Sequence, residues 1–433
     1  MHKSCIYIQK AIYLAPYEVR ACCQRFFVDG KMKGDVALVT LEDPRDIEYS
    51  EIIEAKKKLI EGINNGTDDR CAGCFALKER DWDNIEDEEL NSISVENHSL
   101  CNMKCSYCSD VYYGGVEPQY SLEHLFEGLN DVGDDLHIAW GGGEPTVRKD
   151  FNDLFLSLNE KFHPKTQRVF TNALKYSRVL QEALDSRSTS ITTSIDAGVE
   201  DTFRKVRDSK GLDKVLQFLE RYSKNSPDLI TIKYIFTVDN YDDYNLVQFV
   251  KRIQEHNLTK CNYLISADFN YETLEDEIIF SIISLYFRLH TAGVYAVTFD
   301  DHIFHKVRMI GKDVSSYINN LEVVGGQGKI VKDAIDSFSE KNSNNVIIWG
   351  TGEFSKYLFD TAEEDSYVVS GIVDGMEEKW GSAFMGFEVQ SPQSLVDNKS
   401  DIIIASVNFY GEIFNKLISI GVSRDRIIPN FLL

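Results

Sequence analysis

Six strand-like segments alternate with amphipathic helix-like segments between about residues 90 and 300, and this alternation constrains the fold most. One helix-like segment carries Leu212, Val215, Leu216 and Leu219 at the spacing of a single helix face. Such an alternation predicts parallel βαβ units, and six units predict an α/β fold with a partial (β/α)6 TIM-type barrel. Its active site is expected at the carboxyl ends of the strands. The predicted strands are Ser92–Glu96, Leu136–Trp140, Arg168–Phe170, Ser190–Ser194, Leu229–Thr237 and Asn262–Ser266.

A second α/β unit is predicted after about residue 342. The strands Val346–Trp349, Val368–Val373 and Asp401–Ala405 indicate a small Rossmann-like domain. We therefore expect four parts: a Cys-rich amino-terminal module (1–88), the barrel (89–300), a helical connector (301–342) and the Rossmann-like domain (343–433).

Charge and hydropathy exclude some partners. The 46 Lys and Arg against 69 Asp and Glu leave a net charge of −23. Nucleic-acid binding relies on basic residues that displace counterions, so no nucleic-acid partner is expected. No run of about 20 apolar residues and no signal peptide is visible, so we expect a cytoplasmic protein without a membrane partner.

Eight of the nine cysteines lie before residue 110. In a reducing compartment, clustered cysteines serve more often as metal ligands or catalytic groups than as disulfides. Cys261 begins a predicted strand and is expected in the core. The eight clustered cysteines are Cys5, Cys22, Cys23, Cys71, Cys74, Cys101, Cys105 and Cys108.

Cys101, Cys105 and Cys108 form a C-x3-C-x2-C run after the first predicted barrel strand. Three thiolates on one loop can hold three irons of a [4Fe–4S] cluster and leave the fourth iron open. A zinc site would need a fourth ligand, for which His98 is the nearby candidate. Three unrelated structural cysteines are the remaining alternative.

This triplet, with Tyr107 before its last cysteine, resembles the radical S-adenosylmethionine superfamily over about residues 90–300. The resemblance implies that the turn at Glu144 receives the methionine amino group and that Arg207, with Arg204 as its rival, pairs with the methionine carboxylate. It also implies ribose and carboxylate contacts at Ser194 and Asp196. The implied cofactor-binding residues are Tyr107, Gly142, Gly143, Glu144, Asn172, Ser194, Asp196 and Arg207.

The same resemblance implies a radical enzyme. S-adenosylmethionine would chelate the open iron, and an electron from an external donor of the flavodoxin or ferredoxin type would yield a 5′-deoxyadenosyl radical. That radical would take a hydrogen atom from a bound substrate. The reaction type stays open among epimerisation, dehydrogenation, dehydration and carbon–carbon bond formation.

The amino-terminal cysteines resemble the auxiliary-cluster modules called SPASM or twitch, although here they precede the barrel. The resemblance implies a second [4Fe–4S] cluster on Cys5, Cys22, Cys71 and Cys74, with Cys23 as the spare thiol. A zinc knuckle built from the same four cysteines is the alternative, because C-x2-C is also a zinc spacing.

The last domain resembles nucleotide-sugar-type Rossmann modules, which implies nucleotide binding by Gly350, Gly352 and Asp374. A structural or dimerising role is the alternative. The domain favours a sugar or nucleotide-linked small molecule as substrate, whereas the SPASM-like module favours a peptide. A non-catalytic iron–sulfur redox or scaffold protein is the alternative of a different class.

Overall fold

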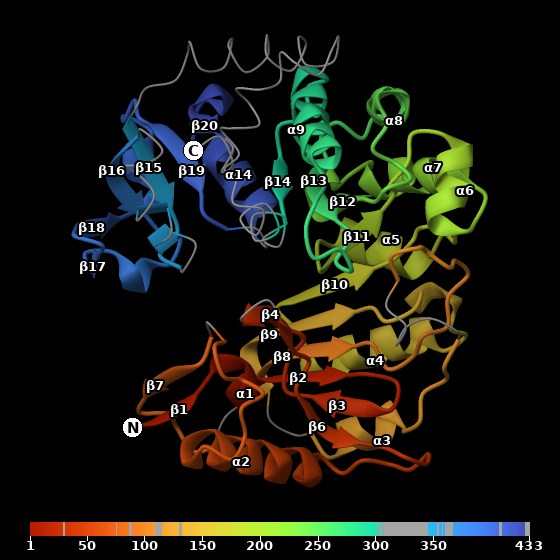
Figure 1. Ribbon diagram of the computed structural model, residues 1–433, viewed down its shortest axis with the longest axis vertical. Coiled ribbons are helices and arrows are strands. Elements are labelled where there is room, and N and C mark those ends of the chain that lie inside the picture. Colours follow the sequence, from red (N-terminus) through yellow and green to blue (C-terminus); the bar gives the residue numbers. More distant parts are fainter. Residues whose placement is uncertain are drawn as a thin grey trace. The chain divides into compact units, whose positions relative to one another are not determined.

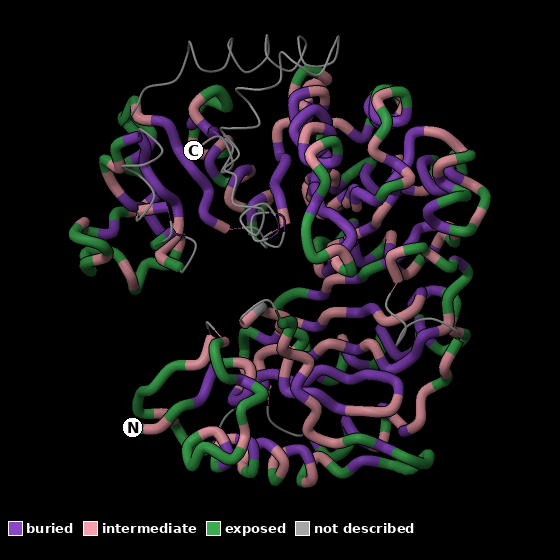
Figure 2. The backbone as a smooth tube through the Cα atoms, viewed as in Figure 1, coloured by how far each residue is buried: buried purple, intermediate pink, exposed green. Residues whose placement is uncertain are grey.

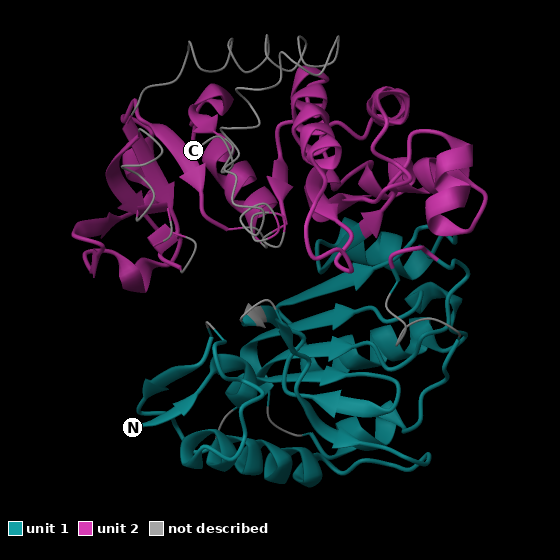
Figure 3. Cartoon of the chain, in the orientation of Figure 1, with its two compact units in different colours: residues 1–104, 108–192 teal, residues 105–107, 193–433 magenta. Residues whose placement is uncertain are grey.

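The computed structural model divides into two compact units, shown in Figure 3. Unit 1 holds residues 1–104 and 108–192, and unit 2 holds residues 105–107 and 193–433. The boundary falls within strand β11 (Thr189–Ser194). The predicted connector at 301–342 lies almost wholly outside the described residues. The structure describes all residues except 29–30, 75, 86–88, 109–114, 130–131, 301–302, 304–305, 307–344, 353–354, 357, 360–366, 407–408 and 429–433.

Unit 1 is built on a sheet with the strand order β11-β10-β9-β8-β2-β3-β6 (Figure 1). Strands β8 to β11 run parallel, and β2 joins β8 in parallel with Leu14 opposite Val95. Strands β3 and β6 extend this sheet in the antiparallel sense. The bounds are β2 (Ala11–Leu14), β3 (Glu18–Arg20), β6 (Ala37–Thr40), β8 (Leu90–Val95), β9 (Val132–Trp140) and β10 (Thr166–Phe170).

Two short antiparallel pairs complete the strands of unit 1: β1 (His2–Ser4) with β7 (Lys78–Arg80), and β4 (Arg25–Val28) with β5 (Lys31–Gly34). Helix α2 ends at Gly66, whose φ of 79° suits a residue without a Cβ. The tube in Figure 2 alternates between buried and exposed residues along α2, as an amphipathic helix requires. The helices of unit 1 are α1 (Ile6–Lys10), α2 (Tyr49–Asn65), α3 (Leu122–Glu127), α4 (Phe151–Phe162) and α5 (Arg178–Asp185).

Helix α4 shows why these segments pack as they do. Its apolar residues recur at helical spacing, and Phe151 and Phe155 lie 5.7 and 5.6 Å from the Trp140 ring, between centroids. The Trp140 indole donates to Gln167 on β10 at 2.8 Å, so its only polar atom is satisfied inside the core. Thus β9, β10 and α4 share one hydrophobic layer.

Unit 2 continues the strand–helix alternation with three parallel strands, β12 (Ile230–Phe236), β13 (Asn262–Ala267) and β14 (Val297–Phe299). Ring contacts from Phe249 on α8 to Tyr234, and from Tyr286 on α9 to Phe299, show which sheet face these helices cover. The helices are α6 (Glu200–Arg207), α7 (Leu212–Ser223), α8 (Asp243–Glu255) and α9 (Asp276–Thr291).

The carboxy-terminal part of unit 2 has its own sheet of order β17-β18-β16-β15-β19-β20. Strand β15 lies between β16 and β19, and all three run parallel. Their carboxyl ends therefore meet where the strand order reverses, the usual place for a ligand crevice in open α/β sheets. The bounds are β15 (Asn345–Trp349), β16 (Val368–Val373), β17 (Ala383–Phe384), β18 (Phe387–Gln390), β19 (Asp401–Ile404), α14 (Tyr410–Ser419) and β20 (Ile427–Ile428).

The predicted α/β class with a parallel sheet is confirmed, because every predicted strand is present within a few residues. The order β8–α3–β9–α4–β10–α5–β11 and then β12–α8–β13–α9–β14 is the repeat expected of a partial (β/α) barrel. The sequence analysis did not include β2, β3, β6 or β14, which are only three or four residues long. No helix of the described residues is long and apolar enough to cross a bilayer.

Candidate functional site

The triplet loop begins where β8 ends, and in unit 1 a side chain holds its first residues. Asn172, just beyond β10, donates through Nδ2 to Asn102 Oδ1 at 2.6 Å and lies 3.8 Å from Cys101 Sγ. Cys101 itself is exposed. Asn172 was predicted as a cofactor contact, and the structure places it beside the first cysteine as a support of the loop.

The glycine-rich turn after β9 packs directly on the chain that leads into the triplet. Gly142 has a φ of +90°, and a Cβ there would lie 2.4 Å from the carbonyl oxygen of His98. A Cβ on Gly143 would lie 2.0 Å from the carbonyl oxygen of Leu100. Only glycine fits either position, so the Gly-Gly pair allows the two backbones to touch.

Glu144 is buried with 1% exposure, and both oxygens of its carboxylate accept hydrogen bonds from the chain. Oε1 accepts from Thr146 N, Thr146 Oγ1 and Thr171 Oγ1 at 3.1, 2.5 and 2.8 Å. Oε2 accepts from Asn172 N at 2.6 Å. Burial raises the pKa of this carboxyl, and the four hydrogen bonds oppose the rise. The carboxylate thus joins the ends of β9 and β10, a positioning role that the sequence analysis missed along with Thr146 and Thr171.

In unit 2 the later part of the triplet loop is held by three side chains, which we call the triplet anchor: Tyr107, Asp196 and Arg207. Asp196 Oδ2 accepts from Tyr107 OH at 2.6 Å and from Arg207 Nη1 at 2.9 Å. Its other oxygen accepts from Ile235 N at 2.7 Å, and Arg207 also bonds the Tyr107 hydroxyl. Burial raises the pKa of the Asp196 carboxyl to about 8, and the hydrogen bond from Ile235 N and the Lys233 charge oppose the rise.

The three residues of the anchor were predicted as separate cofactor contacts, and the structure shows them in contact with one another. A backbone bond from Ser106 N to Val206 O at 2.8 Å adds to the same support. Arg204, the rival of Arg207, is exposed on α6 and lies 3.8 Å from Asp201. Ser194 lies half-buried at the end of β11.

The amino-terminal cysteines Cys5, Cys22, Cys71 and Cys74 line one cavity of unit 1. They come from separate segments: Cys5 caps α1, Cys22 follows β3, and the other two lie in the turns beyond α2. Cys23 is exposed and does not line the cavity, so the structure selects Cys22 from the pair.

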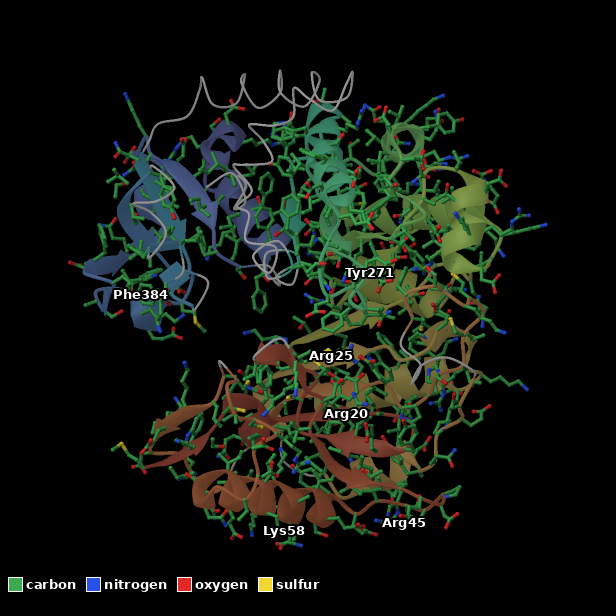
Figure 4. All side chains as sticks on the ribbon, in the orientation of Figure 1. Arg20, Arg25, Arg45, Lys58, Tyr271 and Phe384 are labelled. Carbon is green, nitrogen blue, oxygen red and sulfur yellow. The ribbon has the colours of Figure 1, made fainter. Side chains whose placement is uncertain are left out.

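The β4–β5 hairpin forms one wall of this cavity through Phe26 and Gly34. Arg20 on β3 and Arg25 on β4, both labelled in Figure 4, pair with the same carboxylate of Asp35 at 3.2 and 2.7 Å and hold the hairpin in place. These two ion pairs tie the hairpin to β3, the strand that leads into Cys22.

Burial raises the pKa of the Cys22 and Cys71 thiols to about 12, so they carry protons unless a metal replaces them. No three His, Cys, Asp or Glu side chains within the described part of the chain converge on a single ion position. Cys261 is buried in the core, as predicted. His98 is also buried, which lowers its pKa to about 4.

The carboxy-terminal candidates meet at the end of β15. Gly350 follows this strand with a φ of +121°, and Thr351 Oγ1 donates to Asp374 Oδ2 at 2.7 Å. Lys379 Nζ bonds the same oxygen at 3.0 Å. Burial raises the pKa of the Asp374 carboxyl, but the hydrogen bonds to it have the larger effect. Its pKa therefore lies below the usual value. The predicted ribose-binding acid is therefore already partnered within the domain.

Comparison with protein families agrees with this geometry. Residues 98–253 match the model of the Radical SAM superfamily, and residues 342–428 match the model described as C2185-like, N-terminal. Residues 98–253 are a radical SAM superfamily domain, and the resemblance to that superfamily is confirmed. Such a domain implies a [4Fe–4S] cluster and S-adenosylmethionine as cofactors.

The relatives share only part of their length with this chain. The chain is 28% identical over 169 residues to molybdenum cofactor biosynthesis protein moc-5 of Caenorhabditis elegans, covering 36% of this chain and 27% of that protein. It is 25% identical over 143 residues to the GTP 3′,8-cyclase of Clostridium perfringens (strain SM101 / Type A), covering 32% and 44%. The solved structure of Streptococcus suis SuiB is 13% identical with a TM-score of 0.40, covering 60% of this chain and 57% of that chain. The chain spans less than half the length of these curated relatives.

The triplet anchor predicts a difference between two arginines of α6. Arg207→Ala would leave the carboxylate of Asp196, which is fully buried, without its cation, and should lower the free energy of unfolding by about 3–5 kcal/mol. The matched change Arg204→Ala removes an exposed arginine and should alter the free energy of unfolding by less than about 1 kcal/mol. Urea denaturation followed by circular dichroism measures both. Equal losses would contradict the assigned role of the anchor.

Proposed function

We propose that this chain is a radical enzyme that cleaves S-adenosylmethionine reductively at a cluster on Cys101, Cys105 and Cys108. The observation that carries the proposal is the hydrogen bonding of the loop within each unit: in unit 1 Asn172 bonds Asn102, and in unit 2 the triplet anchor holds Tyr107. All three thiols stay at least partly exposed. A loop held rigidly by hydrogen bonds, with its thiols accessible, suits cluster ligation better than a solvated loop without function.

The residues present fit the two cofactors. The three thiolates would take three irons, and the fourth iron would accept the amino and carboxylate groups of S-adenosylmethionine. The cluster and S-adenosylmethionine supply the hard step, in which one electron breaks the sulfonium bond to give a 5′-deoxyadenosyl radical. The amino group would contact the turn at Gly142, Gly143 and Glu144, where Glu144 Oε2 accepts a hydrogen bond from Asn172 N. Ser194 would contact the ribose.

For the substrate we propose a nucleotide-linked small molecule. Two observations support it: several curated relatives are named GTP 3′,8-cyclases, and the carboxy-terminal domain has a Gly-x-Gly turn between β15 and β16. An external donor of the flavodoxin or ferredoxin type would supply the electron. A peptide substrate is the alternative, which the resemblance of the amino-terminal cysteines to SPASM modules favours.

Replacing Cys101, Cys105 and Cys108 together by Ala should remove about four irons per chain and abolish cofactor cleavage. Anaerobic reduction with S-adenosylmethionine, followed by chromatography for 5′-deoxyadenosine, measures the loss. Cys23→Ala, which removes an exposed cysteine outside both cysteine sites, should change neither quantity. Cleavage that survives in the triple variant would refute the proposal.

We further propose that Cys5, Cys22, Cys71 and Cys74 hold a second [4Fe–4S] cluster, ligated entirely by protein. The observation that supports it is that all four cysteines line one cavity. Cys5 precedes β2 and Cys22 follows the antiparallel β3, so both lie toward the amino end of β2, whereas Cys101 follows the carboxyl end of its parallel neighbour β8. A cluster at that end of the strands suits electron transfer or structural support rather than substrate contact.

This second site predicts that the triplet variant still contains about four irons with a [4Fe–4S] spectrum that S-adenosylmethionine does not change. Adding Cys71→Ala and Cys74→Ala should remove this iron, whereas adding Cys23→Ala should not. Electron paramagnetic resonance and metal analysis report both quantities. One zinc ion per chain and no iron in the triplet variant would establish a zinc knuckle instead.

For the carboxy-terminal domain we propose nucleotide binding at Gly350, Gly352 and Asp374. A Cβ on Gly352 would meet no described atom within 4 Å, so Gly352→Ala should preserve the fold but obstruct a phosphate approaching the turn. The affinity of the Gly352→Ala variant for GTP and UDP-glucose, measured by calorimetry on the full chain, should be about tenfold or more below that of the wild type. Gly371→Ala, whose Cβ would make ordinary contact with Ile347 at 3.7 Å, is the control. Unchanged affinity in Gly352→Ala would favour a structural role.

A further inference from the structure

A polar cluster in unit 2 takes no part in the support of the triplet loop. Lys233 Nζ on β12 lies 3.0 Å from Asp300 Oδ2, just beyond β14. Ser266 Oγ on β13 donates to the same oxygen at 3.0 Å. We call Lys233, Ser266 and Asp300 the strand-end cluster, since Ser266 and Asp300 lie at the carboxyl ends of β13 and β14 and Lys233 reaches Asp300 from the middle of β12.

The cluster lies on the sheet face that α8 and α9 leave uncovered. Tyr234 and Phe299 contact rings of these two helices, and side chains alternate along a strand, so Lys233 and Asp300 point to the opposite face. Their side chains are 23% and 22% exposed, so a ligand can reach them.

The strand-end cluster is also close to the triplet anchor within the same unit. Ile235 donates its backbone N–H to Asp196 at 2.7 Å, and Lys233 precedes it by two residues on the same face of β12. Burial raises the pKa of the Asp196 carboxyl, and the positive charge of Lys233 opposes this rise. A molecule at the cluster would therefore lie next to the segment that positions the cofactor-binding loop.

The chemistry of the cluster selects among ligands. A phosphate or carboxylate would meet Asp300, and a cation would meet Lys233, so neither kind of ion suits the whole cluster. A hydroxyl group can donate to the carboxylate and accept from the ammonium at once, and the Ser266 hydroxyl can do both. The hydroxyl of Thr298, which is 5% exposed on the same face of β14, has no hydrogen-bond partner among the described residues.

We infer that Lys233, Ser266 and Asp300 bind hydroxyl groups of the substrate, which places a sugar or ribose ring at this end of β12–β14. The inference rests on the proposed function and states which groups of the substrate the protein would recognise. A site built to bond a hydroxyl discriminates strongly against an analogue that lacks it, because its own polar groups are then left unpaired.

The test uses probe pairs that differ in hydroxyl-bearing groups: GTP against 2′,3′-dideoxy-GTP, and UDP-glucose against UDP. Calorimetry on the iron-loaded full chain should show that the wild type prefers the hydroxylated member of at least one pair by about tenfold or more. Lys233→Ala and Asp300→Asn should each abolish that preference without weakening binding of the other member. Lys233→Arg, which retains the positive charge, should preserve it.

Lys251→Ala, which removes a lysine from an exposed pair on α8, is the matched control and should bind like the wild type. Circular dichroism identifies any variant that fails to fold, in which case Ser266→Ala serves as the milder substitution. A wild type without preference in either pair, or variants that retain it, would overturn the inference. Formation of 5′-deoxyadenosine by the wild type, measured on the same preparation, tests the proposed function separately.

Discussion

The carboxylate of Asp196 is fully buried, and the candidate active loop depends on how this charge is satisfied. A buried charge is tolerated only when it is paired and hydrogen-bonded. Its partners come from three kinds of element: the Tyr107 hydroxyl from the triplet loop, the Arg207 guanidinium from α6, and the backbone N–H of Ile235 from β12. One side chain thus sets the position of a loop, a helix and a strand relative to one another.

Two carboxylates that were expected to contact a cofactor accept several hydrogen bonds from the chain itself. Glu144 accepts four hydrogen bonds across the ends of β9 and β10, and Asp196 accepts three. Paired charges of this kind need not reorganise when a ligand enters, which is the advantage of a preorganised site. The hydrogen bonds of Glu144 hold the glycine turn in unit 1, and those of Asp196 hold the later part of the triplet loop in unit 2.

Features that depend on residues close together in the chain could be predicted from the sequence. The barrel strands could be predicted because apolar runs such as that of β12 end in polar motifs, and the triplet because its spacing alone suits a cluster. The partners of Tyr107 could not be predicted, since Asp196 lies 89 residues further along the chain. Lys233 and Asp300 are 67 residues apart and belong to no motif. Such pairs become visible only when strand order and register are known.

Within unit 1, the amino-terminal strands link Cys5 to Cys101 more closely than their separation in the sequence suggests. Cys5 caps α1, α1 leads directly into β2, and β2 pairs with β8, the strand that ends before Cys101. The β2–β8 pairing comprises only four opposed residue pairs, from Ala11 with Ser92 to Leu14 with Val95. Strand β2 is buried along its whole length and pairs with β3 on its other side. A metal that joins Cys5 to Cys22 and Cys71 would fix the amino end of β2 and hence support β8, from which the triplet loop emerges. Within unit 1, Cys5 and Cys101 are thus connected through β2 and β8, although they lie at opposite ends of these strands.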